Sequence, residues 1–303
     1  MIEALLIGLR AIQYGAAAMV LGLPAFMIYG RAALGGVPSA WARPLVRLAA
    51  AVLLVSTLGA FVAQTAVMAG SMAEALKPET LGLMTTGTAL GAAYGVRAAL
   101  ALVALVLTLA LRPDGRLWPG LILPAGLIAA SFAWTGHAGA TEGVWRWPHL
   151  AADIVHAVAA LIWIGALAAF VALAGRRGGP AAPVDGLAAA LVGFAGVGTV
   201  AVTALVLSGL VNAWVLAGPR ALPGLLSTPW GVLLTLKLVA LAGMLALAAL
   251  HRYRLAPRLR AGGASADRLA RLRRTLGLEF ALGLAILGLV AAMGLSAPPA
   301  ASF

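Results

Sequence analysis

The sequence contains no cysteine and little charge. Without cysteine among the 303 residues, disulfides, thiolate metal sites and cysteine nucleophiles are excluded, which leaves histidine, methionine and carboxylate side chains as metal ligands. Charged residues make up only 10% of the chain, whereas a soluble domain carries about a quarter. The chain is instead 63% hydrophobic, with a mean hydropathy of +1.03. This composition excludes a soluble domain and predicts an all-α polytopic membrane helix bundle.

Eight apolar stretches are long enough to cross a hydrocarbon core about 30 Å thick, which takes about 20 helical residues. The first stretch has an acidic start and contains Arg10, so we predict a retained helix there and not a cleaved signal peptide. The less apolar residues 71–87 predict a surface segment with a short interfacial helix. We expect one transmembrane domain over residues 1–303, with spans at about 4–29, 46–69, 88–111, 118–135, 149–174, 187–216, 229–251 and 275–296.

The basic residues are distributed unevenly between the connections. A net charge of +12 would suggest a nucleic-acid partner in a soluble protein, but here membrane topology accounts for it and we expect no nucleic acid. The seventh connection is also suited to anionic lipid head groups. By the positive-inside rule the odd-numbered connections are cytoplasmic and both termini lie outside. The odd connections hold Arg31, Arg43, Arg47, Arg112, Arg116, Arg176, Arg177 and eight arginines between 252 and 274, and the even ones only Lys77, Arg146 and Arg220.

Three ionisable residues stand in a row where the fifth span begins. His149, Asp153 and His156 are spaced i, i+4 and i+7, which places them on one face of a helix. Ionisable groups inside a membrane are functional by default, and the candidates for what they bind are a proton and a metal ion. The two histidines are about 10.5 Å apart along the axis, too far to chelate one ion alone. Either Asp153 and one histidine share an ion with another helix, or the row marks successive stations on a path.

A structural interpretation of this row stands beside the functional one. In it, His149 is an interfacial residue, Asp153 pairs with an intramembrane cation such as Arg97, and His156 is hydrogen-bonded in the core. His137 lies between glycines in the preceding outer loop, where the backbone can fold the imidazole over the start of span five. A solvated loop histidine fits the same pattern.

Methionine is the remaining ligand type. Met68 and Met72 lie at i, i+4 near the outer end of span two, on the same predicted side as the histidines. A thioether favours Cu(I), although a methionine pair at helical spacing also fits plain core packing. Met293, near the outer end of span eight, is a weaker candidate.

Span seven carries a second stripe, formed by Lys237, Met244 and His251 at i, i+7 and i+14. These residues either form part of a polar pathway or reflect structural pairing at one point of the helix. Glu279, in span eight, follows two arginines and fits a polar intrusion or a helix-start acid.

Several segments together resemble the copper resistance protein D (CopD) family. They are HLxxDxxH with WIGAL, then SGLVNAW, TPWGVLLTLKL, HRYRLAP and LRRTLGLEF. The resemblance implies an eight-helix bacterial inner-membrane protein that moves copper inward alongside a periplasmic CopC-like copper-binding protein, here a separate partner. It also implies that His149, Asp153 and His156 match the family's polar stretch. Asn212, Trp214, Lys237 and Glu279 match further family positions.

Three functions are compatible with these features. The first is a copper transport protein, not an enzyme, that receives Cu(I) or Cu(II) through His137, His149, Asp153 and His156. No nucleotide-binding P-loop is present, and the loops are too short for an ATPase domain. The second is a haem-b electron-transfer protein, disfavoured because His156 and His251 fall near opposite membrane faces. The third is a non-transporting copper receptor for a periplasmic chaperone.

Overall fold

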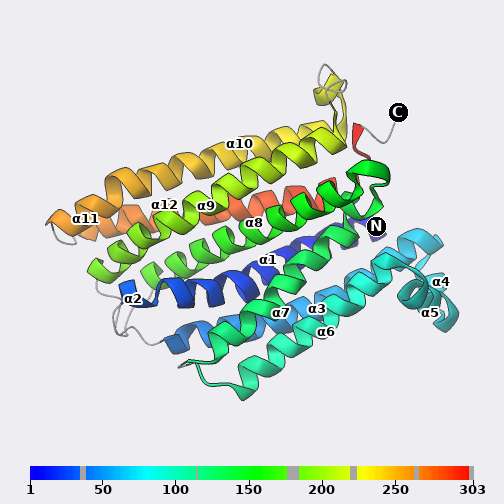
Figure 1. Ribbon diagram of the computed structural model, residues 1–303, viewed down its shortest axis with the longest axis horizontal. Coiled ribbons are helices and arrows are strands. Elements are labelled where there is room, and N and C mark those ends of the chain that lie inside the picture. Colours follow the sequence, from blue (N-terminus) through cyan, green and yellow to red (C-terminus); the bar gives the residue numbers. More distant parts are fainter. Residues whose placement is uncertain (35–38, 114, 176–183, 219–223, 263–265, 300–303) are drawn as a thin grey trace.

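The computed structural model describes residues 1–34, 39–113, 115–175, 184–218, 224–262 and 266–299. Over these ranges the chain is helical and contains no strand. Figure 1 shows the long helices lying side by side in one elongated bundle. The α-helices are α1 (Ile2–Tyr29), α2 (Arg31–Leu34), α3 (Ala42–Ala69), α4 (Met72–Ala75), α5 (Pro78–Gly87), α6 (Ala89–Ala110), α7 (Leu117–Ser131), α8 (Arg146–Gly175), α9 (Val184–Leu216), α10 (Pro229–Leu250), α11 (Ala256–Gly262) and α12 (Ala266–Met293).

Eight helical segments of the described ranges are long and apolar enough to cross a membrane, which confirms the predicted polytopic bundle. The fifth begins earlier than predicted, because a 3₁₀ turn at Gly143–Trp145 leads directly into α8. The seventh extends past its predicted end, because a π-helical turn at His251–Leu255 joins α10 to α11. The segments are Ile2–Tyr29, Ser39–Ala69, Ala89–Ala110, Leu117–Thr135, Gly143–Gly175, Leu187–Leu216, Pro229–Leu259 and Asp267–Met293.

The connection between the second and third spans forms a surface segment, as predicted, but with two short helices in place of one. The Ser71 side chain accepts a hydrogen bond from the backbone N–H of Glu74 and so caps α4. Pro78 begins α5, where its missing N–H and fixed φ are tolerated. Figure 1 shows α4 and α5 projecting from the end of the bundle near the N-terminus.

Helix α1 lies at the centre of the bundle and packs against α3, α7, α8 and α12. Its closest approach is to α8, where two glycines face each other. A Cβ atom on Gly22 would lie 2.5 Å from the Gly165 Cα and 2.7 Å from the Leu161 carbonyl oxygen. Small residues at such a crossing let two backbones come close, which is the main source of helix association in lipid.

The remaining helices form two groups on either side of α1 and α8. On one side α3 packs on α6 and α6 on α7; on the other α8 packs on α9 and α10 on α12. Over the residues that the structure describes, α9 and α10 are not closely packed against each other. This leaves a seam between the α8–α9 pair and the α10–α12 pair, and both cavities described below lie along it.

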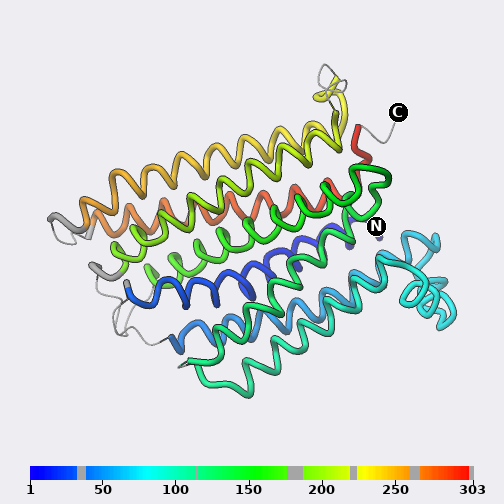
Figure 2. Tube along the Cα trace, in the orientation of Figure 1, coloured from blue at the N-terminus to red at the C-terminus, as the bar shows by residue number. Residues whose placement is uncertain are grey.

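The two ends of the bundle differ in charge. Figure 2 shows both termini at one end, with α4 and α5, whereas the chain between α1 and α3 and the region of α11 lie at the other. This second end carries the described arginines of the odd-numbered connections, such as Arg43, Arg116 and Arg254. Arg176, Arg177 and Arg220, which also entered the topology prediction, lie outside the described residues.

The Gly22–Gly165 crossing gives a stability prediction. Gly22→Ala should lower the stability of the purified protein by about 1–3 kcal/mol, because the added methyl group overpacks the crossing. The matched control is Gly15→Ala in the same helix, where a Cβ atom would meet nothing within 4 Å. Thermal unfolding in detergent, followed by circular dichroism, measures both variants. Equal midpoints for the two would contradict the assigned close approach.

Candidate functional site

One cavity, of about 210 Å³, brings most of the predicted site residues together. It lies on the seam between α8, α9, α10 and α12, at the end of the bundle that holds the termini, and α1 and the turns before α8 close its remaining side. The row on α8 therefore shares one face, as its spacing predicts. The predicted residues that line the cavity are His137, His149, Asp153, His156, Asn212 and Lys237.

The two outer histidines are held by fixed hydrogen bonds. The Thr141 hydroxyl donates to the His137 carbonyl oxygen at 3.1 Å and lies 2.7 Å from His149 Nδ1. A hydroxyl has only one proton, so with that proton assigned to the His137 carbonyl oxygen, His149 Nδ1 donates and Nε2 keeps its lone pair. His137 Nε2 lies 3.2 Å from the Met293 carbonyl oxygen. Because a carbonyl only accepts, His137 keeps its lone pair on Nδ1. Each imidazole thus retains one nitrogen able to bind a metal ion.

His156 lies deeper, and both of its ring nitrogens have partners. The Ser208 hydroxyl donates to the Ala204 carbonyl oxygen at 2.5 Å and accepts from His156 Nδ1 at 3.0 Å. His156 Nε2 therefore has the lone pair, which accepts a hydrogen bond from Lys237 Nζ at 3.3 Å. The ammonium group stands where a metal ion bound to Nε2 would be, so a metal ion reaches His156 only after Lys237 moves.

Asp153 completes the row and connects it to α9. Asn212 Nδ2 donates to Asp153 Oδ1 at 3.2 Å. The other amide atom, Asn212 Oδ1, is buried and accepts no hydrogen bond from any described residue. Lys237 and His137 both lie within electrostatic range of the carboxylate. An anionic side chain beside an unsatisfied acceptor forms an environment that favours a cation.

These residues do not form a preassembled metal centre. Across the described ranges, no three His, Cys, Asp or Glu side chains are close enough to hold one ion. The helical rise explains this, because it separates His149 from His156 by about 10.5 Å. The two predicted arrangements, an ion shared with another helix and successive stations on a path, both stay predictions.

Arg97 does not pair with Asp153, so the example given in the structural interpretation is wrong; the intramembrane cation near Asp153 is Lys237. Its guanidinium donates to Gln13 Oε1 at 2.8 Å, to the Ser131 hydroxyl and carbonyl oxygens at 2.9 Å each, and to Thr135 Oγ1 at 3.0 Å. It also lies 3.9 Å from the centre of the Phe132 ring. The side chain is 1% exposed, and its role is to join α1, α6 and α7.

Of the predicted methionines, only the weaker candidate lines this cavity. Met68 is 58% exposed near the end of α3, and neither it nor Met72 lines the cavity. Met293 does line it, and its carbonyl oxygen lies 3.2 Å from His137 Nε2. Trp214 is exposed near the end of α9, as expected of an interfacial anchor.

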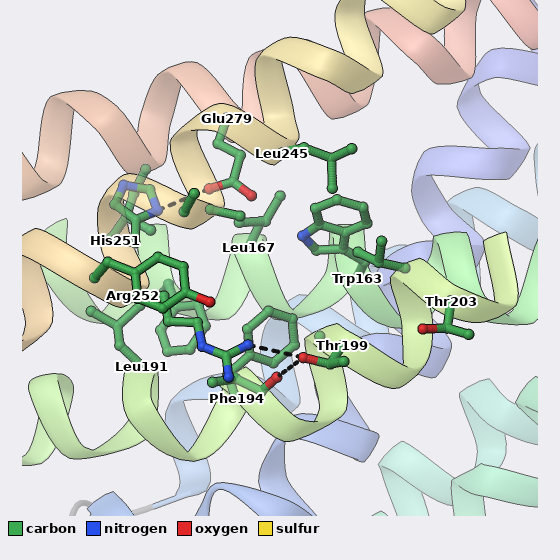
Figure 3. Close-up of a pocket in the computed structure, with 18 residues that line it drawn as sticks. Trp163, Leu167, Leu191, Phe194, Thr199, Thr203, Leu245, His251, Arg252 and Glu279 are labelled. Atoms are coloured by element: carbon green, nitrogen blue, oxygen red, sulfur yellow. Dashed lines mark hydrogen bonds and ion pairs between the residues drawn. The ribbon is translucent and has the colours of Figure 1, made fainter. Parts of the chain in front are cut away.

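Met244 and His251 of the predicted stripe, and Glu279 of α12, lie farther along the seam. Met244 is buried in an apolar cluster with Trp163 and Leu205. His251 and Glu279 line a second cavity, of about 260 Å³ (Figure 3). His156 and His251 therefore belong to separate cavities and cannot share one haem iron.

Sequence reasoning missed the residues that orient the histidines. Ser208 and Thr141 are hydrogen-bonding partners of the His156 and His149 rings, and Gly209 lies beside His156, where a Cβ atom would make ordinary contact with Cε1 at 3.5 Å. Ser208 precedes Gly209 in the quoted SGLVNAW segment, but a lone serine in an apolar helix gives no sign of its partner. Arg10 and Tyr14 of α1 also line the cavity.

Comparison with known proteins identifies the family. A family model described as "Copper resistance protein D-like, N-terminal domain" matches residues 1–147, and one described as "Copper resistance protein D" matches residues 188–293. "Copper resistance protein D" of Pseudomonas syringae pv. tomato is 33% identical over 262 residues, which is 84% of each chain. The chain belongs to the copper resistance protein D family. The resemblance seen in the sequence is thereby confirmed, and so is the assignment as a copper resistance membrane protein.

A second relative covers less of the chain. "Inner membrane protein YebZ" of Escherichia coli (strain K12) is 33% identical over 132 residues, or 42% of each chain. No solved structure matches. The two family models leave residues 148–187 between them, which include most of α8 with Asp153 and His156, so the role of these side chains in this family member rests on the geometry.

The Arg97 contacts give a second stability prediction. Arg97→Lys should lower stability by about 1–3 kcal/mol, because an ammonium group cannot reach all the acceptors and leaves buried ones unpaired. Arg116→Lys, at an exposed position, makes the same change without this loss. Thermal unfolding in detergent compares the two. A variant at position 97 as stable as the wild type would contradict the role of Arg97 in joining three helices.

Proposed function

We propose that this protein carries copper across the bacterial inner membrane, receiving it at the periplasmic face in the His137–His156 cavity and passing it inward. The observation that carries this proposal is the convergence of His149, Asp153 and His156 on one cavity within a copper resistance protein D family member. Imidazole nitrogen and carboxylate oxygen are ligands that copper accepts.

Each group has a distinct role in the proposed path. His137 and His149, at the mouth, capture copper with their free ring nitrogens. Asp153 supplies negative charge that offsets the desolvation of the incoming cation. Lys237 occupies His156 Nε2 when copper is absent and acts as a tethered cation that copper must displace.

The driving force in this proposal is the membrane potential. An inside-negative potential favours inward movement of a cation by about 2.3 kcal/mol per charge per 100 mV. The protein therefore acts as a transporter and not as an enzyme, and no nucleotide hydrolysis is required. A separate periplasmic CopC-like protein would deliver copper to the 132–147 turns at the mouth.

The Asp153 carboxylate gives the direct test of this proposal. In cells that lack other copper uptake, Asp153→Asn should reduce copper accumulation to the level without the protein, because it removes the charge and keeps the shape. Asp267→Asn, an exposed aspartate at the other end of the bundle, makes the same change away from the path. Elemental analysis of washed cells measures both, with protein levels matched by immunoblotting. Wild-type accumulation by the Asp153 variant would exclude this role.

The proposed orientation has its own test. Since the chain has no cysteine, single cysteines report topology without background. Glu79→Cys in α5 and Arg254→Cys in the π-helical turn lie at opposite ends, and both positions are exposed. In intact spheroplasts, a membrane-impermeant maleimide should label position 79 at once and position 254 only after permeabilisation. The reverse pattern would place the histidine cavity on the cytoplasmic side.

A further inference from the structure

The second cavity contains a buried histidine and glutamate whose arrangement the fold does not explain. Glu279 of α12 is 1% exposed, and His251, where the π-helical turn begins, is 5% exposed. Figure 3 shows both side chains at one end of this cavity, facing each other. A π-helical turn inside a long helix is uncommon and often marks a functional position.

The hydrogen bonds of His251 leave one ring nitrogen directed at the carboxylate. The Thr275 hydroxyl lies 3.0 Å from the Arg271 carbonyl oxygen and 2.8 Å from His251 Nε2. With the hydroxyl proton assigned to the carbonyl oxygen, Thr275 accepts from Nε2. In neutral imidazole, Nδ1 then carries the lone pair. Nδ1 lies 3.0 Å from Glu279 Oε2, yet this oxygen accepts no aligned hydrogen bond within the described part of the chain.

This pair has the geometry of two neighbouring ligands of one cation. Nδ1 and a carboxylate oxygen at 3.0 Å need a cation between them, which is either a proton, as in a histidine–glutamate ion pair, or a metal ion. Metal bonds of about 2.0–2.1 Å that meet at a right angle place their donor atoms about 2.9 Å apart. Right angles between nitrogen and oxygen donors are typical of tetragonal Cu²⁺. The 3.0 Å between His251 Nδ1 and Glu279 Oε2 matches this donor–donor distance, and the two atoms are not aligned for a hydrogen bond.

The surroundings leave room for the ion. The cavity measures about 260 Å³ and is lined mostly by apolar and aromatic side chains, with Thr199 and Thr203 as polar groups. The nearby cation, Arg252, donates to Thr199 Oγ1 at 3.0 Å. In Figure 3 its guanidinium points toward Thr199 and away from Glu279, so the carboxylate is not neutralised by it.

The position of this pair relates it to the outer cavity. Both cavities lie on the seam between α8–α9 and α10–α12, and the apolar cluster of Trp163, Leu205 and Met244 separates them. Lys237 and His251 are 14 residues apart on one continuous helical segment, which corresponds to about 21 Å of rise. The inner pair thus lies beyond a closed apolar layer on the same path.

We propose that His251 Nδ1 and Glu279 form a second metal site, which binds Cu²⁺ at the inner end of the seam after the ion has passed the apolar layer. This inference rests on the proposed transport function. The remaining coordination positions face the cavity and are open to water or to an acceptor from the cytoplasmic side. The open positions make the site one of release and not of storage.

Copper titration of the purified full-length protein in detergent tests this site. With Cu²⁺ as the probe, the wild type should bind two ions per chain. Pulsed dipolar electron paramagnetic resonance should give a distance of about 20 Å between them, from the helical rise. Glu279→Gln should remove one ion, Asp153→Asn should remove the other, and Thr203→Val, in the same inner cavity, should keep both.

The outcomes separate the two proposals. One ion per chain without a dipolar distance, or two ions unaffected by Glu279→Gln, would overturn the inner site and leave a structural ion pair. Loss of an ion in Glu279→Gln with none in Asp153→Asn would overturn the outer site instead. The dipolar measurement on the wild type decides the inner site even if the Glu279 variant does not fold.

Discussion

Inside a bilayer no water is available to satisfy a charged side chain, so each one must find its partners within the bundle. The described structure meets this requirement in two ways. Arg97 is fixed by neutral acceptors from α1 and α7 and from the turn after α7, and it joins the helices on one side of α1. Lys237, Asp153, His156, His251 and Glu279 instead face two cavities on the other side. In our proposal, Arg97 makes a rigid support and the cavity residues take part in transport.

The seam between α9 and α10 follows from how the helices pair. Each is packed on another partner, α8 or α12, and not closely on the other. A histidine–carboxylate group lies near each end of the seam, and an apolar layer that includes Met244 lies between them. This arrangement suits a path that opens to one side at a time. In our proposal the tethered Lys237 cation and the incoming copper ion compete for His156, which links occupancy of the outer cavity to movement of α10.

The sequence was sufficient for the spans and for the shared face of the α8 row, because hydropathy and helical spacing act within one segment. It was insufficient for contacts between segments. The pairing of Lys237 with His156, of Glu279 with His251, and of Arg97 with Ser131 in place of Asp153 depends on helix rotation, which a one-dimensional pattern does not contain. Met68 and Met72 show the same limit: their spacing suited a pair on one helix, but α3 ends at Ala69, so Met72 lies in α4, and Met68 is exposed.

In our proposal, copper crosses the membrane through this protein alone. Copper uptake into sealed proteoliposomes measures this directly. Purified protein would be reconstituted, an inside-negative potential imposed, and copper in the lumen measured with an enclosed chelating dye. We expect copper uptake that rises with the imposed potential and is absent from protein-free liposomes. Copper bound to the protein with none reaching the lumen would contradict transport and would indicate a membrane receptor that holds copper for another protein.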